Sequence, residues 1–291
     1  MRNNKLLTLK IFLLGFTLFD LSKLLLAQNA SIITPPFDAG EIVHRISHNQ
    51  GATLTSEFLV DTNIVCIPTT KEQWYPSVAF DGTNFLVVWG DTRSGSNDDI
   101  YAVRVNKSGV ILDLINIAVC TNTSWQGFPS VAFDGTNYLV VWQDRRNGSN
   151  NDDIYCARVN QSGLVIDTAG IPVSKAVSEQ WYPSVAFDGT NFLIVWGDAR
   201  NGPNDDIYGA RVTPSGIILD PIGLPISTQA GWQGFPSVAY DGTNHLVVWE
   251  DRRAFNIYGT RVSQAGVVLD SNGIAISTAV NNQEVPSLTF C

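Results

Sequence analysis

Apolar and polar positions recur along this chain in a long repeat. Prolines at positions 76, 129, 183, 236 and 286 open successive copies, at spacings of 53, 54, 53 and 50 residues. Each copy reads as an apolar "PSVAF", an Asp-Gly turn, a second apolar run, a polar loop and a run such as "IYAVRV". The second run, Phe85 to Trp89, is apolar on both alternating faces, which is typical of a strand covered on both sides.

Each repeat therefore predicts about four short strands in a meander, with no helix pattern. Asp-Gly between apolar runs is a strong hairpin pattern. A period near 50 residues with four strands is typical of a β-propeller blade. A parallel β-helix would use a shorter period, and a sandwich would not need near-identical units. We expect an all-β fold, a β-propeller of about five four-stranded antiparallel blades.

The repeats divide the chain into an N-terminal part and a propeller. We predict a signal peptide over residues 1–27, an N-terminal segment over 28–75 with the outer strands of a partial blade, and a repeat propeller over 76–291. The complete units are 76–128, 129–182, 183–235 and 236–285, and another starts at 286. The two chain ends could close the ring as one hybrid blade. The alternative is a truncated piece of a larger propeller.

The first residues have the layout of a secretory signal peptide. A basic start precedes an apolar run over residues 11–19, and small residues follow, with Ala27 as the expected cleavage point. The alternative is an uncleaved anchor helix, but the run is shorter than the ~20 residues that span a bilayer. The sequence predicts a protein that is secreted, periplasmic or held at the cell surface.

The net charge limits the classes of binding partner, and the cysteine positions limit the disulfides that can form. The formal net charge is −9, and loss of residues 1–27 removes a net +3. So acidic a surface repels phosphate groups, which argues against nucleic acid and, after cleavage, against membrane as partners. Cys66, Cys120, Cys156 and Cys291 fall at non-equivalent places in the repeat. We expect most of these thiols to be unpaired, with one adventitious disulfide as the alternative. We also expect the protein to be a monomer.

The repeat resembles the WD40-like repeat of the TolB family. The matching elements are the Asp81-Gly82 turn, the run Phe85–Trp89, the Asp91-x-Arg93 step and the Ile100-Tyr101 pair. The resemblance covers most of the chain and implies a propeller fold. It implies no activity, because such blades serve scaffolds, binding modules and peptidase gates alike.

Charged residues repeated in every unit are interpreted as structural ion pairs. A buried guanidinium needs a carboxylate partner, and catalysis usually needs one asymmetric constellation rather than four copies. The acid/base alternative is therefore weaker. The predicted pairs draw on Asp91, Arg93, Arg104, Asp144, Arg146, Arg158, Asp198, Arg200, Arg211, Asp251, Arg253 and Arg261, with Asp113, Asp167, Asp220 and Asp270 as further carboxylates.

No metal or cofactor is expected. The pairs Asp98-Asp99, Asp152-Asp153 and Asp205-Asp206 offer clustered oxygens of the kind that calcium uses. Their spacing matches no calcium loop, and the fourth unit lacks the pair, so calcium is the minority interpretation. His245 takes the slot of Phe85 and is expected to pack as a strand residue.

The segments that lead into each unit vary, and we call them the entrance segments. Units one and three enter through "EQWYPS", whereas units two and four enter through "WQGFPS". Entrance segments and the loops between second and third strands should emerge on one propeller face. Aromatic plates beside Asp, Asn and Arg suit a sugar or peptide ligand, although they could equally cap the blades. The candidate ligand-binding residues are Trp74, Trp125, Trp181, Trp232, Tyr75, Tyr182, Phe128 and Phe235.

The sequence thus predicts an exported, non-enzymatic propeller that binds a carbohydrate or a surface protein on this face. No catalytic residue is assigned. One alternative is a glycan-acting hydrolase or lyase, which would need an unrepeated carboxylate pair, and Glu179, Glu250 and Glu284 occur only singly. The other alternative is a structural repeat fragment of a larger surface protein.

Overall fold

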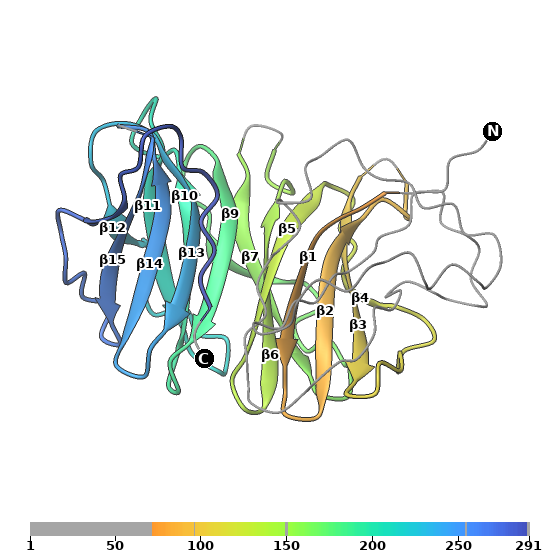
Figure 1. Cartoon of the computed structure of the whole chain (residues 1–291). Coiled ribbons are helices and arrows are strands. Elements are labelled where there is room, and N and C mark those ends of the chain that lie inside the picture. The colour runs from red at the N-terminus through yellow and green to blue at the C-terminus, as the bar shows by residue number, and fades with distance from the viewer. Residues whose placement is uncertain (1–71, 96, 149–150, 254, 290–291) are drawn as a thin grey trace, which may run out of the picture.

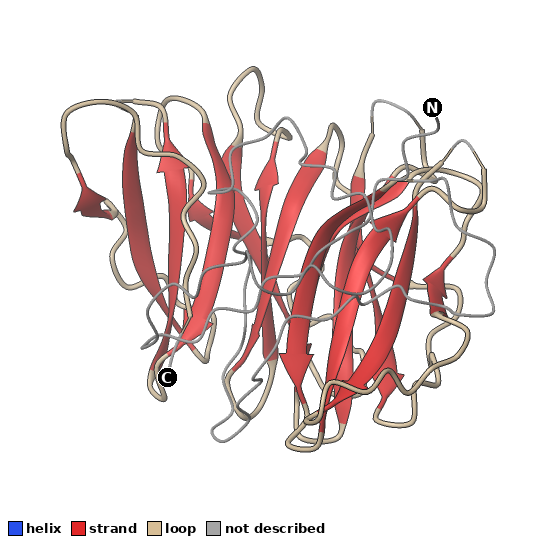
Figure 2. Cartoon of the chain, turned by 45° about the vertical axis from the view of Figure 1, so that its right-hand side comes forward, coloured by secondary structure: helices blue, strands red, loops and turns tan. Residues whose placement is uncertain are grey.

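The repeats fold into four antiparallel sheets of four strands each, within the part of the chain that the structure describes. The computed structural model describes residues 72–289, except 96, 149–150 and 254. Figure 1 shows the sheets side by side in chain order, and Figure 2 shows strands and loops in the described part. This arrangement confirms the all-β propeller expected from the repeat.

The sheets, here called blades one to four, have the same strand order. Blade one contains β1 (Gln73–Phe80), β2 (Asn84–Asp91), β3 (Asp99–Asn106) and β4 (Ile117–Cys120). Blade two contains β5 (Gln126–Phe133), β6 (Asn137–Asp144), β7 (Asp153–Asn160) and β8 (Ile171–Ser174). Blade three contains β9 (Gln180–Phe187), β10 (Phe192–Asp198), β11 (Asp206–Val212) and β12 (Leu224–Ser227). Blade four contains β13 (Gln233–Tyr240), β14 (Asn244–Asp251), β15 (Asn256–Ser263) and β16 (Ile274–Ser277).

The Asp-Gly turns join the first and second strands as predicted. The Asp81 carboxylate accepts hydrogen bonds from the backbone N–H groups of Thr83 and Asn84, at 2.7 and 2.6 Å. Gly82 has a φ of 94°, a left-handed conformation that suits glycine. The later repeats make the same turn at Asp134, Asp188 and Asp241. The turn therefore fixes the hairpin register in every blade.

A buried tryptophan on the second strand anchors each blade. Trp89, Trp142, Trp196 and Trp249 are at most 1% exposed. Each indole N–H donates to the carboxylate two residues later, at 2.7 to 3.3 Å. Because a buried N–H without a partner is costly, this bond lets the blade bury its largest side chain.

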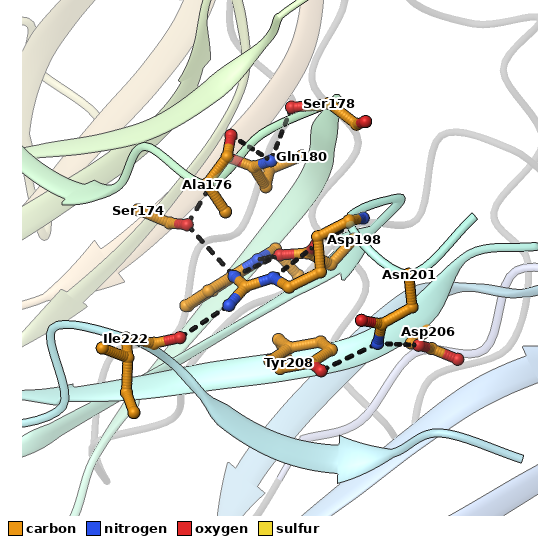
Figure 3. Close-up of polar contacts among 11 residues, drawn as sticks. Ser174, Ala176, Ser178, Gln180, Asp198, Asn201, Asp206, Tyr208 and Ile222 are labelled. Atoms are coloured by element: carbon orange, nitrogen blue, oxygen red, sulfur yellow. Dashed lines mark hydrogen bonds and ion pairs between the residues drawn. The ribbon is translucent and has the colours of Figure 1, made fainter.

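The same carboxylates form ion pairs with the arginine two residues further on. The N···O distances are 2.5 to 2.7 Å for the pairs Asp91–Arg93, Asp144–Arg146, Asp198–Arg200 and Asp251–Arg253. Arg200 also donates to Ser174 Oγ of blade two and to the carbonyl of Ile222. Figure 3 shows this network around Asp198. The pairs therefore connect neighbouring blades as well as loops within one blade.

A second arginine set sits on the third strands. Arg104, Arg158, Arg211 and Arg261 pair with Asp113, Asp167, Asp220 and Asp270 at 2.6 to 2.9 Å. Arg104, Arg158 and Arg211 also donate to a backbone carbonyl of the following blade. Arg261 has no such bond among the described residues. The set thus holds each described blade to the next one, up to blade four.

The fifth repeat begins as the others do. Leu288 N–H donates to Ser237 Oγ at 3.0 Å, which repeats the bond from Val238 N–H to Ser184 Oγ at 3.1 Å between β13 and β9. Val285 has a φ of 47°, close to the values of its counterparts in the other four repeats. The chain past β16 therefore follows β13 as the next inner strand would.

Other predictions concern residues outside the described part. These are the signal peptide over 1–27, residues 28–71 of the N-terminal segment 28–75, Cys66 and Cys291. Cys120 and Cys156 are free and buried, and burial raises the pKa of the Cys120 thiol to about 11. No helix of the described residues is long and apolar enough to span a membrane.

Candidate functional site

The entrance segments touch the preceding blade at one end of the strands. Gln126 N–H donates to the carbonyl of Asp98, which follows the polar loop between β2 and β3, at 2.8 Å. Gln180 and Gln233 donate in the same way to Asp152 and Asp205, at 2.7 and 2.9 Å. The entrance aromatics and these polar loops therefore share a face.

The four entrance tryptophans are half-buried and occupy two different settings. Trp74 and Trp181 lie on β1 and β9, opposite Gly90 and Gly197 of the neighbouring strands. In blades two and four, glycine takes the tryptophan position, and Gln143 or Glu250 stands opposite. Trp125 and Trp232 instead precede their strands, in the slot that Glu72 and Glu179 fill in blades one and three.

Glycine makes room for the displaced indole in the even-numbered blades. A Cβ on Gly127 would come within 2.3 Å of Trp125 Cζ2, and one on Gly234 within 2.3 Å of Trp232 Cη2. The large and small positions are therefore exchanged between the two kinds of blade. The two entrance patterns that differ in sequence therefore place their tryptophans in different surroundings.

Trp125 stands between a carboxylate and a guanidinium. Its indole N–H donates to Asp98 Oδ2 of blade one at 2.8 Å. The guanidinium carbon of Arg145 lies 4.5 Å from the centroid of its ring, a cation–π contact. We call Asp98, Trp125 and Arg145 the first Arg–Trp site.

Blade four repeats this arrangement with blade three. Trp232 N–H donates to Asp205 Oδ2 at 2.6 Å, and the Arg252 guanidinium carbon lies 4.1 Å from the Trp232 ring centroid. We call Asp205, Trp232 and Arg252 the second Arg–Trp site. Each of its members follows its counterpart by 107 residues.

Each of the two arginines forms an ion pair through its Nε with a buried carboxylate. Arg145 Nε donates to Asp152 at 2.9 Å, and Arg252 Nε donates to Glu250 at 2.9 Å. Both carboxylate side chains are at most 2% exposed, whereas the arginine side chains are 42% and 48% exposed. Among the described residues, neither arginine has a hydrogen-bond partner for its Nη1 and Nη2 atoms. Each therefore presents its terminal nitrogens outward from a fixed base.

Sequence reasoning missed these arginines. The relevant pattern was the doubled arginine in "DRR" of units two and four, against "DTR" and "DAR" in units one and three. It varies together with "WQGF", which indicates that both belong to one arrangement.

The aromatic residues before the repeated prolines form a continuous stack. Ring centroids are separated by 4.2 Å for Tyr75–Phe128, 4.5 Å for Phe128–Tyr182 and 4.4 Å for Tyr182–Phe235. Their φ values of 50 to 52° are left-handed, which is uncommon for bulky residues. We call these four residues the aromatic stack. Trp125 and Trp232 each contact it, at 5.7 Å from Phe128 and 5.8 Å from Phe235.

Burial perturbs one carboxyl group in each Arg–Trp site. Desolvation raises the pKa of Asp98, against the Trp125 hydrogen bond that lowers it, and the charges of Asp91 and Glu72 raise it further. Asp205 behaves likewise, with burial as the main cause and Glu179 as a neighbouring charge. The Trp181 indole also faces Asp205 and lowers its pKa, although its N–H makes no hydrogen bond of good geometry to the described residues.

The remaining candidates fall outside these sites or support them. Glu250 is the buried partner of Arg252, and Glu284 is exposed. His245 is buried against Tyr240 with a pKa lowered by desolvation. Residues 72–289, where described, contain no group of three or more His, Cys, Asp or Glu side chains suited to a metal ion.

The fold has counterparts among solved structures. No family model matches the chain, and no curated protein matches it in sequence. An α-L-arabinanase of Penicillium chrysogenum, solved with arabinobiose, aligns with a TM-score of 0.53 and 12% identity over 76% of this chain and 70% of that one. An endo-arabinase of Bacteroides thetaiotaomicron aligns with a TM-score of 0.49 and 13% identity, over 70% and 78%.

These similarities bear on the fold alone. At such identities, a shared propeller says nothing by itself about shared chemistry. The resemblance to WD40-like repeats of the TolB family is not supported, since no family model matches, whereas the propeller itself stands.

Proposed function

We propose that this protein is a glycan-acting hydrolase whose acid is the perturbed carboxyl of an Arg–Trp site. The observation that carries the proposal is the setting of Asp98 and Asp205: each accepts an indole N–H, at 2.8 and 2.6 Å, and burial together with the charge of Glu72 or Glu179 raises its pKa. Glycoside hydrolysis commonly uses two carboxyl groups whose environments separate their pKa values. The arabinanase that shares the fold, solved with arabinobiose, supports carbohydrate as the ligand class.

In the proposed reaction, the protonated Asp98 carboxyl donates its proton to the glycosidic oxygen as the bond to the anomeric carbon breaks. The Glu72 carboxylate takes a proton from the water that forms the new bond to that carbon. Asp205 and Glu179 have the same roles at the second site. The indole N–H of Trp125 or Trp232 fixes the orientation of the acid.

Release of reducing sugar from a panel of polysaccharides tests this function. The panel contains arabinan, galactan, xylan, mannan and β-glucan, with arabinan first because of the shared fold. We expect wild-type protein to cleave at least one of them. The Asp98→Asn/Asp205→Asn double variant should lose about 10²-fold or more in rate, because the proton donor is gone. Glu284→Gln, an exposed carboxylate outside both sites, is the matched control.

A second candidate function is non-catalytic glycan binding. The duplicated site favours it, since repeated equivalent sites suit a binding module that gains avidity. The β1, β5, β9 and β13 strands also carry no carboxylate. Binding to a polysaccharide with no release of reducing sugar from any member of the panel would contradict the hydrolase and support this module. Action outside the cytoplasm is proposed from the pattern of residues 1–27 alone.

A further inference from the structure

We infer that Arg145 and Arg252 are two equivalent receptors for adjacent hydroxyl groups of a neutral sugar, at the two ends of one aromatic track. The inference rests on the proposed carbohydrate ligand. It adds that this ligand is uncharged, that the two arginines contact it and that it is bound at two points. Neither arginine belongs to the structural pairs repeated in every blade.

Geometry makes each arginine a prepared donor. The planar guanidinium lies over an indole, and a buried carboxylate holds its Nε. The terminal nitrogens of Arg145 and Arg252 then offer hydrogen bonds with little loss of side-chain freedom. By contrast, Arg146 and Arg200 use Nε, Nη1 and Nη2 on protein partners.

An acceptor lies beside the donor at the first site. Asp98 Oδ2 accepts from Trp125, whereas Asp98 Oδ1 has no hydrogen-bond partner among the described residues. A sugar hydroxyl can donate and accept at once. Two neighbouring hydroxyls can therefore bind together, one accepting from Arg145 and the other pairing with Asp98 Oδ1, which accepts when the carboxyl is ionised and donates when it is protonated. A simple anion would use only the arginine.

The surrounding charge disfavours acidic sugars. The charge of Arg145 is already matched by Asp152, and Asp98 and Glu72 lie near enough to affect one another. At the second site, Glu250 matches Arg252, and Asp205 and Glu179 add two further carboxyls. A uronate would meet this excess of negative charge, whereas a neutral sugar would not.

The aromatic stack connects the two sites. Contacts run from Trp125 to Phe128, Tyr182, Phe235 and Trp232, with neighbouring centroids 4.4 to 5.8 Å apart. Phe128, Tyr182 and Phe235 are only half-buried. A linear glycan held at both ends would cross these rings, and attachment at two points raises affinity through effective concentration.

Affinity electrophoresis of the purified full chain tests the inference. The gels contain arabinan, galactan, xylan, mannan or β-glucan as neutral probes and polygalacturonate as the acidic probe. Arg145→Lys and Arg252→Lys keep the charge opposite the buried carboxylate but lose the planar stack and one terminal nitrogen. We expect each to weaken binding of the retarding neutral glycan about tenfold, and the double variant to abolish retardation.

Arg261→Lys is the matched control, an exposed arginine paired with Asp270 and outside both sites. Thermal unfolding of every variant verifies that the fold persists. The inference is overturned if no neutral glycan retards the protein, if polygalacturonate binds as well as any neutral glycan, or if the two lysine variants bind like wild type. If the protein binds a neutral glycan in a way that depends on the two arginines but does not hydrolyse it, the proposed hydrolase function is overturned and the present inference stands.

Discussion

Blades one and three differ from blades two and four at the entrance, although their sheets are built alike. In blade one, Trp74 pairs with Gly90 of the neighbouring strand, and Glu72 occupies the position before the strand. In blade two, Gly127 stands opposite Gln143, and Trp125 takes that earlier slot. The entrance tryptophan of blade two thus lies two residues earlier in its repeat than the entrance tryptophan of blade one.

This exchange has a chemical consequence. Once the indole leaves the strand in blade two, it can accept Arg145 on its ring and donate to Asp98 of blade one. Thr92 and Ala199 occupy the equivalent arginine positions in blades one and three. The same scaffold therefore has two kinds of entrance, and among the described residues an arginine lies over the entrance tryptophan in blades two and four.

The largest expected effect concerns the scaffold that all blades share. Asp144→Ala should cost about 3–5 kcal/mol of unfolding free energy, since Arg146 and the Trp142 N–H lose a buried partner. Urea unfolding measures it. Asp198→Ala in blade three should cost a similar amount. A loss under about 1 kcal/mol in either blade would contradict a common scaffold.

The next effect tests the exchange itself. Gly127→Ala should cost about 1–3 kcal/mol, because the new Cβ would meet the Trp125 ring at 2.3 Å. Gly90→Ala is the control in blade one, where no atom lies nearer than 3.8 Å, and should change stability by less than about 0.5 kcal/mol. Chemical denaturation of both variants gives the comparison.

A double-mutant cycle locates the cause. Trp125→Ala combined with Gly127→Ala should be less destabilising than the sum of the two single changes, because the clash is removed. Additive effects would show that the glycine is needed for its backbone rather than for the indole.

A smaller effect separates the two even-numbered blades. Asp270 pairs with an Arg261 that is 51% exposed, and this pair lowers the Asp270 pKa to about 2. Asp270→Asn should cost less than about 1 kcal/mol. Asp167→Asn in blade two should cost more, since Arg158 is more buried and also reaches Pro214 of blade three. Equal losses in thermal unfolding would remove this distinction.

The smallest effect is a pH dependence of the Arg–Trp sites. The pKa values of Asp98 and Asp205 are raised in the folded protein. These two carboxyl groups therefore contribute stability below pH 3.8, and that contribution is lost as the pH rises through their folded pKa values. The stability of the Asp98→Asn/Asp205→Asn variant, measured as its difference from wild type, should therefore be more favourable at pH 7 than at pH 4. Melting temperatures across this range measure it, and a pH-independent difference would contradict the raised values.

Much of the scaffold was predictable because its causes are local. The Asp81-Gly82 turn and the two-faced run Phe85–Trp89 each specify their conformation within a few residues. The Asp91–Arg93 pair likewise spans two positions. The fold class followed from repetition of these elements, and the structure confirms it.

The candidate site was predictable only in part, because its contacts join distant residues. The sequence marked the entrance segments as the variable region, and the aromatic stack, Trp125 and Trp232 lie there, whereas the Asp and Arg members of the two sites come from the loops between second and third strands. Asp98 meets Trp125 27 residues later. No local pattern predicts such a contact, so the role of Arg145 was missed.

By itself, then, the sequence determined the repeat, the blade and the Asp–Arg pairs within it, since short-range geometry suffices for each. Only the tertiary structure decided which tryptophans leave their strand, which arginines keep free nitrogens and how four aromatic rings align. Those outcomes depend on packing between one blade and the next, where side chains compete for the same space and the same hydrogen-bond partners.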